Sequence, residues 1–564
     1  MADTATAEAD SSQRFRGRAL VNGPRPRSPF RRPAIVVVEI FALLAFWYVA
    51  VVTFEWVNPL FYPPPGEVLG ALGDIWDEGV LTKNLRFSIT VWGKGYLIGA
   101  VTGVAFGVVM GTSNMTYRLG APIVWSLWAT PLIALRPMTA VWFGFGDRPI
   151  VFLVILGTFF PIALNTAAGA REVDGELIRA ARVFGAGRSE VFRKIRLPWT
   201  RPYILAGLRL AIPTSIIALL IGELLGSSKG LGSLITLYTS RFRTERTFAV
   251  ILVLVLLSVA LVQFVELVDR RFRRGPQERT LGPRVAAQTD SQADPARRHS
   301  AIQNRAVRRI VKSTGWNLAV LLEVGLVLLL WEFLISGLEI WNPKLFPPPS
   351  ALFSAFGDLV SSGRFGEHWS FSMKNALYGF LLATIVGVVI GLVMSSSRWA
   401  GDLLGPPFWA AYSLPRIALQ PLLVLWMGFG SGPKVLIIFL MAVFPIALNT
   451  MEGLRTVDRS LLSAARVYGA SRLQCFYKVE VPAAVPLILT GIRMGVARAM
   501  VGVVVGEFIG GSKGLGYLID RSAYEFELDT ALALTLLLVV MANVGMFLVD
   551  VARRVLVPWY SSTG

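Results

Sequence analysis

The chain of 564 residues is 54% hydrophobic and only 16% charged, with a mean hydropathy of +0.58. An average soluble domain carries about 25% charged residues, so this composition indicates a membrane protein with many spans. One cysteine and two histidines exclude a disulfide framework and leave too few ligands for a zinc, haem or iron–sulfur site. The sequence has no phosphate-binding loop of the G-x-x-x-x-G-K-S/T type, so we expect this chain to bind no cofactor and no metal itself.

The net charge of +19 is confined to four stretches. They are 1–32, 169–201, 270–312 and 451–480. Each stretch flanks apolar runs, which fits the excess of Lys and Arg in cytoplasmic segments better than it fits nucleic-acid binding. We therefore expect no nucleic-acid partner, cytoplasmic N- and C-termini, and contacts between the basic segments and anionic membrane lipid. The first apolar run is long enough to remain as a span rather than to be a cleaved signal peptide.

A shift by 284 positions superimposes the first part of the sequence on the second without a gap. The run PIALNT at 161–166 recurs at 445–450, and Gly-Leu-Gly at 230–232 recurs at 514–516. Chance similarity between hydrophobic segments does not keep one register over about 180 residues, so the chain is a tandem duplication.

The duplication predicts four parts of the chain. They are a basic cytoplasmic tail at 1–32, two membrane repeats at 33–269 and 316–564, and a disordered basic linker at 270–315. Each repeat contains six apolar runs of about 20 residues, the length that a bilayer core requires. In the first repeat these lie near 34–53, 90–111, 120–142, 149–168, 202–225 and 247–268. In the second they lie near 318–336, 374–395, 404–426, 433–452, 486–509 and 530–551.

The number of spans fixes the relation between the repeats. An even number of spans returns the chain to its starting side, so the two repeats are parallel rather than inverted. The predicted fold class is an all-α polytopic membrane protein of about 12 transmembrane helices in two parallel six-helix repeats. Glycines spaced four residues apart along 99–111 and 387–391 predict close helix packing.

The connection between the fourth and fifth spans is the most distinctive segment of each repeat. In the first repeat, Ala180 and Ala181 precede Gly185, and Pro198 follows. Small alanines permit close approach to a partner, glycine suits a left-handed turn, and proline is expected to end the segment before the next span. The second repeat has the same pattern at Ala464, Ala465, Gly469 and Pro482. We interpret the segments near 179–189 and 463–473 as paired docking helices for a partner with two-fold symmetry.

This pattern resembles the E-A-A-x3-G-x9-I-x-L-P signature of permease subunits in bacterial ABC importers, most closely those of the nitrate/sulfonate/bicarbonate/taurine type. The resemblance implies a type I importer fold in the bacterial inner membrane, with both permease halves in one chain. It also implies two ATP-binding cassette subunits that bind ATP and dock on these helices. An extracytoplasmic binding protein would deliver a small solute such as a sulfonate, nitrate or bicarbonate. The glutamate of the signature is Arg179 in one repeat and Ser463 in the other, so the two docking sites need not be equal.

Four polar residues inside the spans are candidates for a pathway or gate, because polar groups in the membrane are costly. They are Asn165, Glu223, Asn449 and Glu507. The alternatives are a headgroup-level carboxylate or a helix-packing partner for the glutamates, and helix-to-helix hydrogen bonds for the asparagines.

Three other functions stay open at this point. A secondary transporter driven by an ion gradient also has two parallel six-span halves, but it needs no repeated docking segment. A membrane-embedded enzyme would need a catalytic constellation that two histidines and one cysteine hardly supply. An importer of the same class could also carry a vitamin precursor or an aromatic acid.

Overall fold

The computed structural model describes residues 58–272 and 324–557, together with residues 41, 45 and 47–55. It divides into two compact units, Met1–Val57 and Asn58–Gly564. The described part of the first unit includes the π turn η1 (Val49–Thr53). The predicted tail, most of the predicted linker and most of the first predicted span lie outside the described residues.

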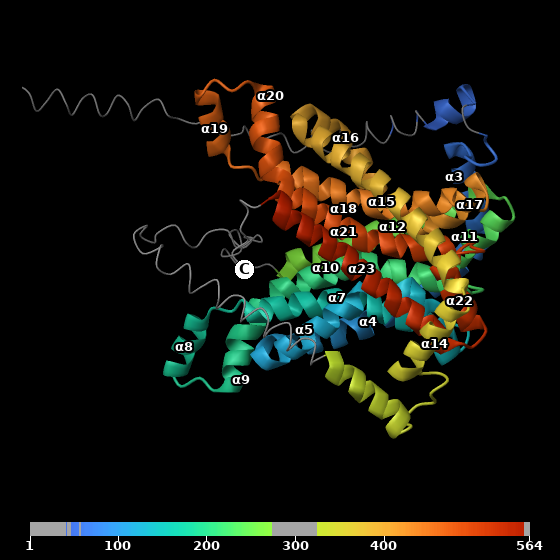
Figure 1. Ribbon diagram of the computed structural model, residues 1–564. Helices are drawn as coiled ribbons and strands as arrows, with labels where there is room; N and C mark the ends of the chain where they lie inside the picture. Colours follow the sequence, from blue (N-terminus) through green and yellow to red (C-terminus); the bar gives the residue numbers. More distant parts are fainter. Residues whose placement is uncertain (1–40, 42–44, 46, 56–57, 273–323, 558–564) are drawn as a thin grey trace, which may run out of the picture. The chain divides into compact units, whose positions relative to one another are not determined.

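In the second unit, the helices from α3 to α12 recur 284 residues later as α14 to α23 (Figure 1). The first set is α3 (Pro65–Asp77), α4 (Val80–Thr112), α5 (Asn114–Ala129), η2 (Leu132–Leu135), α6 (Arg136–Phe143), α7 (Arg148–Arg171), α8 (Gly175–Val183), α9 (Arg188–Val191), η3 (Phe192–Arg196), α10 (Leu197–Leu224), α11 (Leu231–Ser240) and α12 (Thr244–Phe272). The second set is α14 (Pro349–Ser361), α15 (Arg364–Ser396), α16 (Arg398–Ser413), η7 (Arg416–Leu419), α17 (Gln420–Met427), α18 (Gly432–Arg455), α19 (Arg459–Val467), α20 (Arg472–Cys475), η8 (Phe476–Glu480), α21 (Val481–Phe508), α22 (Leu515–Tyr524) and α23 (Leu528–Leu556). The duplication seen in the sequence is therefore also a duplication of secondary structure. We call the two sets copy one and copy two.

The predicted all-α class is confirmed, and the described residues contain no strand. Within the described ranges, eight helices are long and apolar enough to cross a membrane, or nine if one bent pair counts as a span. The predicted count of 12 is therefore not reached within the described residues. The first predicted span of copy two, 318–336, lies partly outside the described residues. Its described part is the short apolar helix Val324–Gly337.

The prediction that the third span of each copy is one continuous helix is wrong. In copy one it breaks between α5 and η2, and in copy two α16 and η7 meet at a bend of 76°. Thr130 and Leu414 take extended backbone conformations at these breaks, each directly before a proline. A residue before proline is pushed out of the helical region by the proline ring, so the sequence itself causes the break.

The predicted boundaries of two further spans are also wrong. The second spans begin about ten residues earlier than predicted, at Val80 and Arg364. The fifth spans run continuously from Arg188 to Leu224 and from Arg472 to Phe508. The prediction that Pro198 ends the preceding segment is wrong, because Pro198 lies at the second position of α10, which directly continues α9 and the π turn η3.

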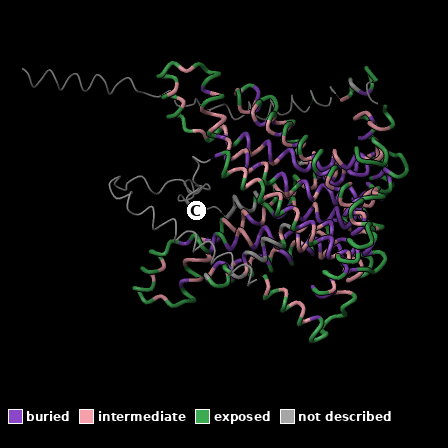
Figure 2. The backbone as a smooth tube through the Cα atoms, in the orientation of Figure 1, coloured by how far each residue is buried: buried purple, intermediate pink, exposed green. Residues whose placement is uncertain are grey.

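Glycines set the distance between helices in the core, which Figure 2 shows as buried residues along the long helices. Helix α7 packs between α4 and α10, and α18 packs between α15 and α21. A Cβ added at Gly107 would lie 2.6 Å from the carbonyl oxygen of Ala163, and one at Gly391 would lie 2.7 Å from that of Ala447. No side chain fits in that space, so the predicted small-residue packing faces are confirmed.

Candidate functional site

Each connection between the fourth and fifth spans contains a short helix that starts on an aspartate. Asp174 Oδ1 accepts a hydrogen bond from the N–H of Glu176, and Asp458 Oδ1 accepts one from the N–H of Ser460, both at 2.8 Å. Such caps satisfy N–H groups that have no partner within the helix. Hydrogen bonds from the backbone and hydroxyl of Ser460 hold the pKa of Asp458 below its usual value, so this cap stays ionised at neutral pH.

The same helices, α8 and α19, end on the glycines that the sequence singled out. Gly185 has φ +83° and Gly469 has φ +79°, and the following N–H groups donate to Ala181 and Ala465 at 2.9 and 3.0 Å. This hydrogen bond from the residue after a left-handed glycine closes the end of a helix. The expected left-handed turn is confirmed. The helices lie at 175–183 and 459–467, a few residues before the predicted ranges.

The surface that these two helices present is uncovered and partly apolar. No residue of α8 or α19 is buried. The most exposed large apolar side chains directly precede the glycines: Val183 (85%), Phe184 (89%), Val467 (85%) and Tyr468 (91%). We call these four side chains the tip pairs. Sequence analysis missed them, although two consecutive apolar residues inside a basic connection were a signal.

The other predicted docking residues surround the tip pairs. Ala180 and Ala464 are exposed, whereas Ala181 and Ala465 are half-buried. Arg179 pairs with Glu176 on the same helix, so its side chain is held along α8. Ser463 is exposed at the equivalent place on α19. In Figure 1, α8 and α9, like α19 and α20, project beyond the long helices at one common end of the second unit.

Glu223 and Glu507 are buried and fully used by hydrogen bonds at the other end of the spans. Ser88 Oγ donates to Glu223 Oε1 at 2.6 Å, and the N–H of Gly232 donates to Oε2 at 2.8 Å. Ser372 and Gly516 make the same bonds to Glu507 at 2.7 Å. Each carboxylate thus holds the N-terminus of the next short helix, α11 or α22, where negative charge is favoured. These contacts are those of a packing partner, and a role in gating stays a prediction.

The Gly-Leu-Gly motif exists because of this carboxylate. Gly230 has φ +105°, and a Cβ at that position would collide with the carboxyl group of Glu223. Gly514 is related in the same way to Glu507. The motif and the glutamate, which the sequence analysis treated separately, therefore form one structural element in each copy.

The two asparagines are half-buried, and each bonds within its own helix. Asn449 Nδ2 also donates across helices to the sulfur of Met494 on α21 at 3.6 Å. Asn165 Nδ2 donates to the carbonyl of Pro161 at 2.7 Å, and Asn449 Nδ2 donates to that of Pro445 at 2.8 Å. Pro161 has no N–H, so the carbonyl of Gly157 loses its helical donor, and the hydroxyl of Thr214 on α10 bonds it at 2.7 Å. The pathway role of the asparagines stays a prediction.

Two tryptophans join the copies reciprocally. Trp142 Nε1 donates to the carbonyl of Leu345 at 2.7 Å, and Trp426 Nε1 donates to the carbonyl of Phe61 at 3.0 Å. Their rings stack on Phe346 and Tyr62, respectively. Each copy therefore inserts the segment before its second span against the Trp-x-Gly-Phe-Gly turn of the other copy. The two tryptophans lie 284 positions apart in the sequence, but no local pattern predicts that each contacts the other copy.

Two arginines inside copy two have no basic counterpart in copy one. Arg416 and Arg498 lie within electrostatic range of each other, whereas copy one has Leu132 and Thr214 at the matching positions. The Arg416 guanidinium lies 5.4 Å from the ring centre of Tyr412 and 5.0 Å from that of Phe444. Arg498 is classed as exposed by its accessible surface, although many protein atoms lie near its guanidinium group.

Among the described residues, no carboxylate acts electrostatically on either guanidinium of this pair. Element η7, which begins with Arg416, packs against α10 of copy one. The pair therefore lies where the two copies meet. A comparison of the two copies for unequal charge inside the spans would have found it from the sequence.

Comparison with known proteins gives one family. The family described as "Binding-protein-dependent transport system inner membrane component" matches twice, at residues 99–274 and 383–562. The chain belongs to this family. The permease is similar to a protein named for aliphatic sulfonate transport in Bacillus subtilis, 33% identical over 251 residues, which are 44% of this chain and 90% of that protein.

Two other relatives differ in what their names say they transport. A riboflavin transport system permease protein of Chloroflexus aurantiacus is 35% identical over 250 residues, 43% of this chain and 90% of its own. A taurine transport system permease protein of Escherichia coli is 28% identical over 258 residues, 45% of this chain and 91% of its own. Each relative spans less than half of the permease, as expected when one chain holds two permease units. The permease is therefore a multi-pass protein of the inner membrane.

Proposed function

We propose that this permease is the complete membrane part of an ATP-driven importer, with both halves in one chain. The observation that carries the proposal is the pair of α8 and α19, which present exposed tip pairs on left-handed glycine turns. Two uncovered apolar tips in a basic setting suit binding grooves on two related ATPase subunits. ATP would be bound and hydrolysed on those subunits, and this chain would catalyse no reaction.

The direction of the molecule in the membrane follows from charge. The connections that hold α8 and α19 are basic, so this end faces the cytoplasm, as do both termini. A binding protein would then dock at the opposite end, where Glu223 and Glu507 hold α11 and α22. Nucleotide binding would move the docking helices and shift the spans between inward- and outward-facing states.

The proposed cargo is a small anion, such as a sulfonate, nitrate or bicarbonate. Arg416 and Arg498 support this choice, because two guanidinium groups without a carboxylate favour an anion between the copies. Relatives named for sulfonate and taurine transport agree with it. The relative named for riboflavin transport keeps a larger, neutral cargo as the second candidate.

Intact-complex mass spectrometry after purification in mild detergent tests the proposed function. One copy of this chain with two ATPase subunits is the expected stoichiometry. A chain that runs alone and supports uptake from an ion gradient without ATP would instead establish a secondary transporter. Identical ATPase subunits would show that both docking helices fit one groove despite Arg179 and Ser463.

A further inference from the structure

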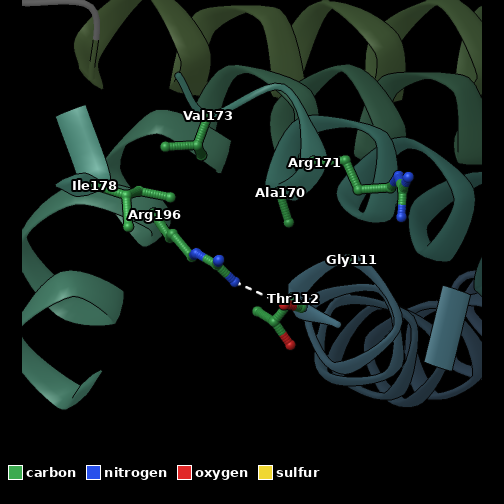
Figure 3. Close-up of a pocket in the computed structure, with 7 residues that line it drawn as sticks. All are labelled: Gly111, Thr112, Ala170, Arg171, Val173, Ile178 and Arg196. Atoms are coloured by element: carbon green, nitrogen blue, oxygen red, sulfur yellow. Dashed lines mark hydrogen bonds between the residues drawn. The ribbon is translucent and has the colours of Figure 1, made fainter. Parts of the chain in front are cut away.

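A cavity of about 540 Å³ lies between the end of α4 and the docking connection of copy one. It is lined by Val108, Val109, Thr112, Arg182, Arg188, Val191, Phe192 and Arg196. A second cavity of about 190 Å³ adjoins it and shares Thr112 and Arg196. Figure 3 shows this second cavity, with Arg196 reaching from η3 towards the end of α4 and bonding the carbonyl of Thr112 at 2.8 Å.

Three arginines make the larger cavity strongly positive. The guanidinium groups of Arg182 and Arg188 form no ion pair or hydrogen bond with the described residues, and the Nε of Arg196 is buried without a partner. The nearby acids are engaged elsewhere, since Glu176 pairs with Arg179 and Glu190 with Lys194. Arginine donors without an acceptor favour a bound group with several anionic oxygens.

The rest of the cavity wall is apolar and continues onto the outside of the spans. Val108, Val109, Val191 and Phe192 line it together with the arginines. Above Val109, helix α4 exposes Leu97 and Val101 along the same side of the span. A free phosphate or nucleotide would gain nothing from this surface, whereas an acyl chain would remove it from water.

Copy two differs at the residue that completes the positive wall. Glu480 stands where copy one has Arg196, so a phosphate there would meet a negative charge. Arg472 is the counterpart of Arg188 and donates to the carbonyl of Ser396 at 3.5 Å. The matching carbonyl in copy one, that of Thr112, accepts from Arg196 instead. The backbone of the two connections is the same, so the difference lies in the side chains.

We propose that copy one alone holds an anionic glycerophospholipid in this cavity, with its phosphate on Arg182, Arg188 and Arg196 and an acyl chain along α4. The site lies at the end of the spans that bears the docking helix, where anionic lipid is available in the inner leaflet. A lipid bound there would fix the base of α8 in one copy and not in the other. The proposal goes beyond the importer function and does not depend on it.

The test is native mass spectrometry of the full chain in nanodiscs that contain phosphatidylglycerol and phosphatidylcholine. We expect one phosphatidylglycerol to stay bound per chain after detergent exchange. Arg188→Gln should weaken its retention roughly fivefold, and Arg196→Glu should weaken it roughly 30-fold. The reciprocal change Glu480→Arg should create a second retained phosphatidylglycerol.

Controls separate a built site from general basicity and from misfolding. Arg193 is exposed on the same π turn but does not line the cavity, so Arg193→Gln should leave retention unchanged. Arg182→Gln and Arg188→Gln alter exposed side chains, so they test the site even if Arg196→Glu does not fold. Equal retention of both lipids, or displacement of the lipid by millimolar inorganic phosphate, would overturn the proposal.

Discussion

The two copies share one backbone but not one set of charges. Helices recur at a constant offset, and Glu223 and Glu507 make the same pair of hydrogen bonds. Charge differs where the copies meet and at the cavity of copy one: Arg136 against Gln420, Leu132 against Arg416, Thr214 against Arg498, and Arg196 against Glu480. Fusion into one chain lets each half diverge separately, so the scaffold has stayed symmetric while the surfaces have not.

The largest expected effect comes from the symmetric docking turns. Replacing both Gly185 and Gly469 with valine forces a β-branched residue into a left-handed backbone, which reshapes both tips. We expect uptake to fall by at least roughly tenfold while the ATPase activity persists, because the motion is no longer transmitted. The measurement is ATP hydrolysed per solute imported in proteoliposomes.

A matched control lies at the other end of the same helix. Gly175 has no neighbour within 4 Å of an added Cβ, and copy two has Arg459 at this position, so Gly175→Ala should keep full coupling. Single variants at Gly185 and Gly469 would show whether both tips matter equally. Wild-type coupling in the double variant would refute the docking assignment.

The second prediction concerns the arginine pair of copy two. Cys475→Val removes the native cysteine and introduces the valine that copy one has at the matching position. In this background, Arg498→Cys gives a protein with a single cysteine. It should react faster with an anionic sulfonatoethyl thiosulfonate than with a cationic trimethylammonioethyl one. Adding Arg416→Gln should lower this ratio of rates roughly tenfold, because one nearby positive charge is lost.

Charge rather than shape is tested by the matched substitution Arg416→Lys, which should keep the ratio high. No reaction at position 498, or a ratio that does not respond to Arg416, would remove the support for an anionic cargo. The importer assignment would then still stand on the stoichiometry of the complex.

The third prediction compares the buried carboxylates. In Glu223→Gln, one of two oxygens that accept hydrogen bonds becomes an NH2 group, which faces the N–H of Gly232 or the hydroxyl of Ser88. We expect a loss of about 2 kcal/mol in the free energy of unfolding. Glu507→Gln should cost more, because Lys434 lies within range of Glu507 where copy one has Ile150. Thermal unfolding of both variants in one detergent measures the difference.

Equal losses in the two variants would mean that Lys434 does not contribute to the stability of the buried carboxylate. If neither variant loses stability, the carboxylates do not hold α11 and α22, and their role as a gate becomes the better interpretation.

The smallest expected effect is at the junction where Arg136 faces copy two. Burial raises the pKa of Asp520 to about 6, although Arg136 acts in the opposite direction. The folded state therefore favours the protonated acid, and stability falls as the pH rises from about 4 through 6. Asp520→Asn should raise the unfolding free energy by about 1 kcal/mol at pH 8, since water screens part of the full effect.

The gain from Asp520→Asn should shrink as the pH falls through 6 and vanish below about pH 3, where the native acid is protonated in both the folded and unfolded states. Copy one has Thr236 at the matching place, so Thr236→Val serves as a control without pH dependence. A gain that is independent of pH would show that packing rather than ionisation causes it.

The sequence by itself determined the membrane class, the duplication and the glycine turns at Gly185 and Gly469. Hydropathy and net charge report how residues partition between water and lipid, which needs no coordinates. The offset of 284 residues can also be read without coordinates, because identical residues recur in register along the sequence. The left-handed turn at Gly185 was predictable, because glycine is the residue that most readily takes the left-handed conformation directly after the end of a helix.

Tertiary structure decided what the buried polar groups do and where the copies meet. Glu223 stood out in the sequence as a costly charge, but its donors, Ser88 and Gly232, come from other elements that only folding brings together. The break at Thr130 follows a local rule, yet hydropathy alone joins the helices on either side because both are apolar. The cavity at Arg196 depends on contacts between α4 and η3, 84 residues apart, which no local pattern records.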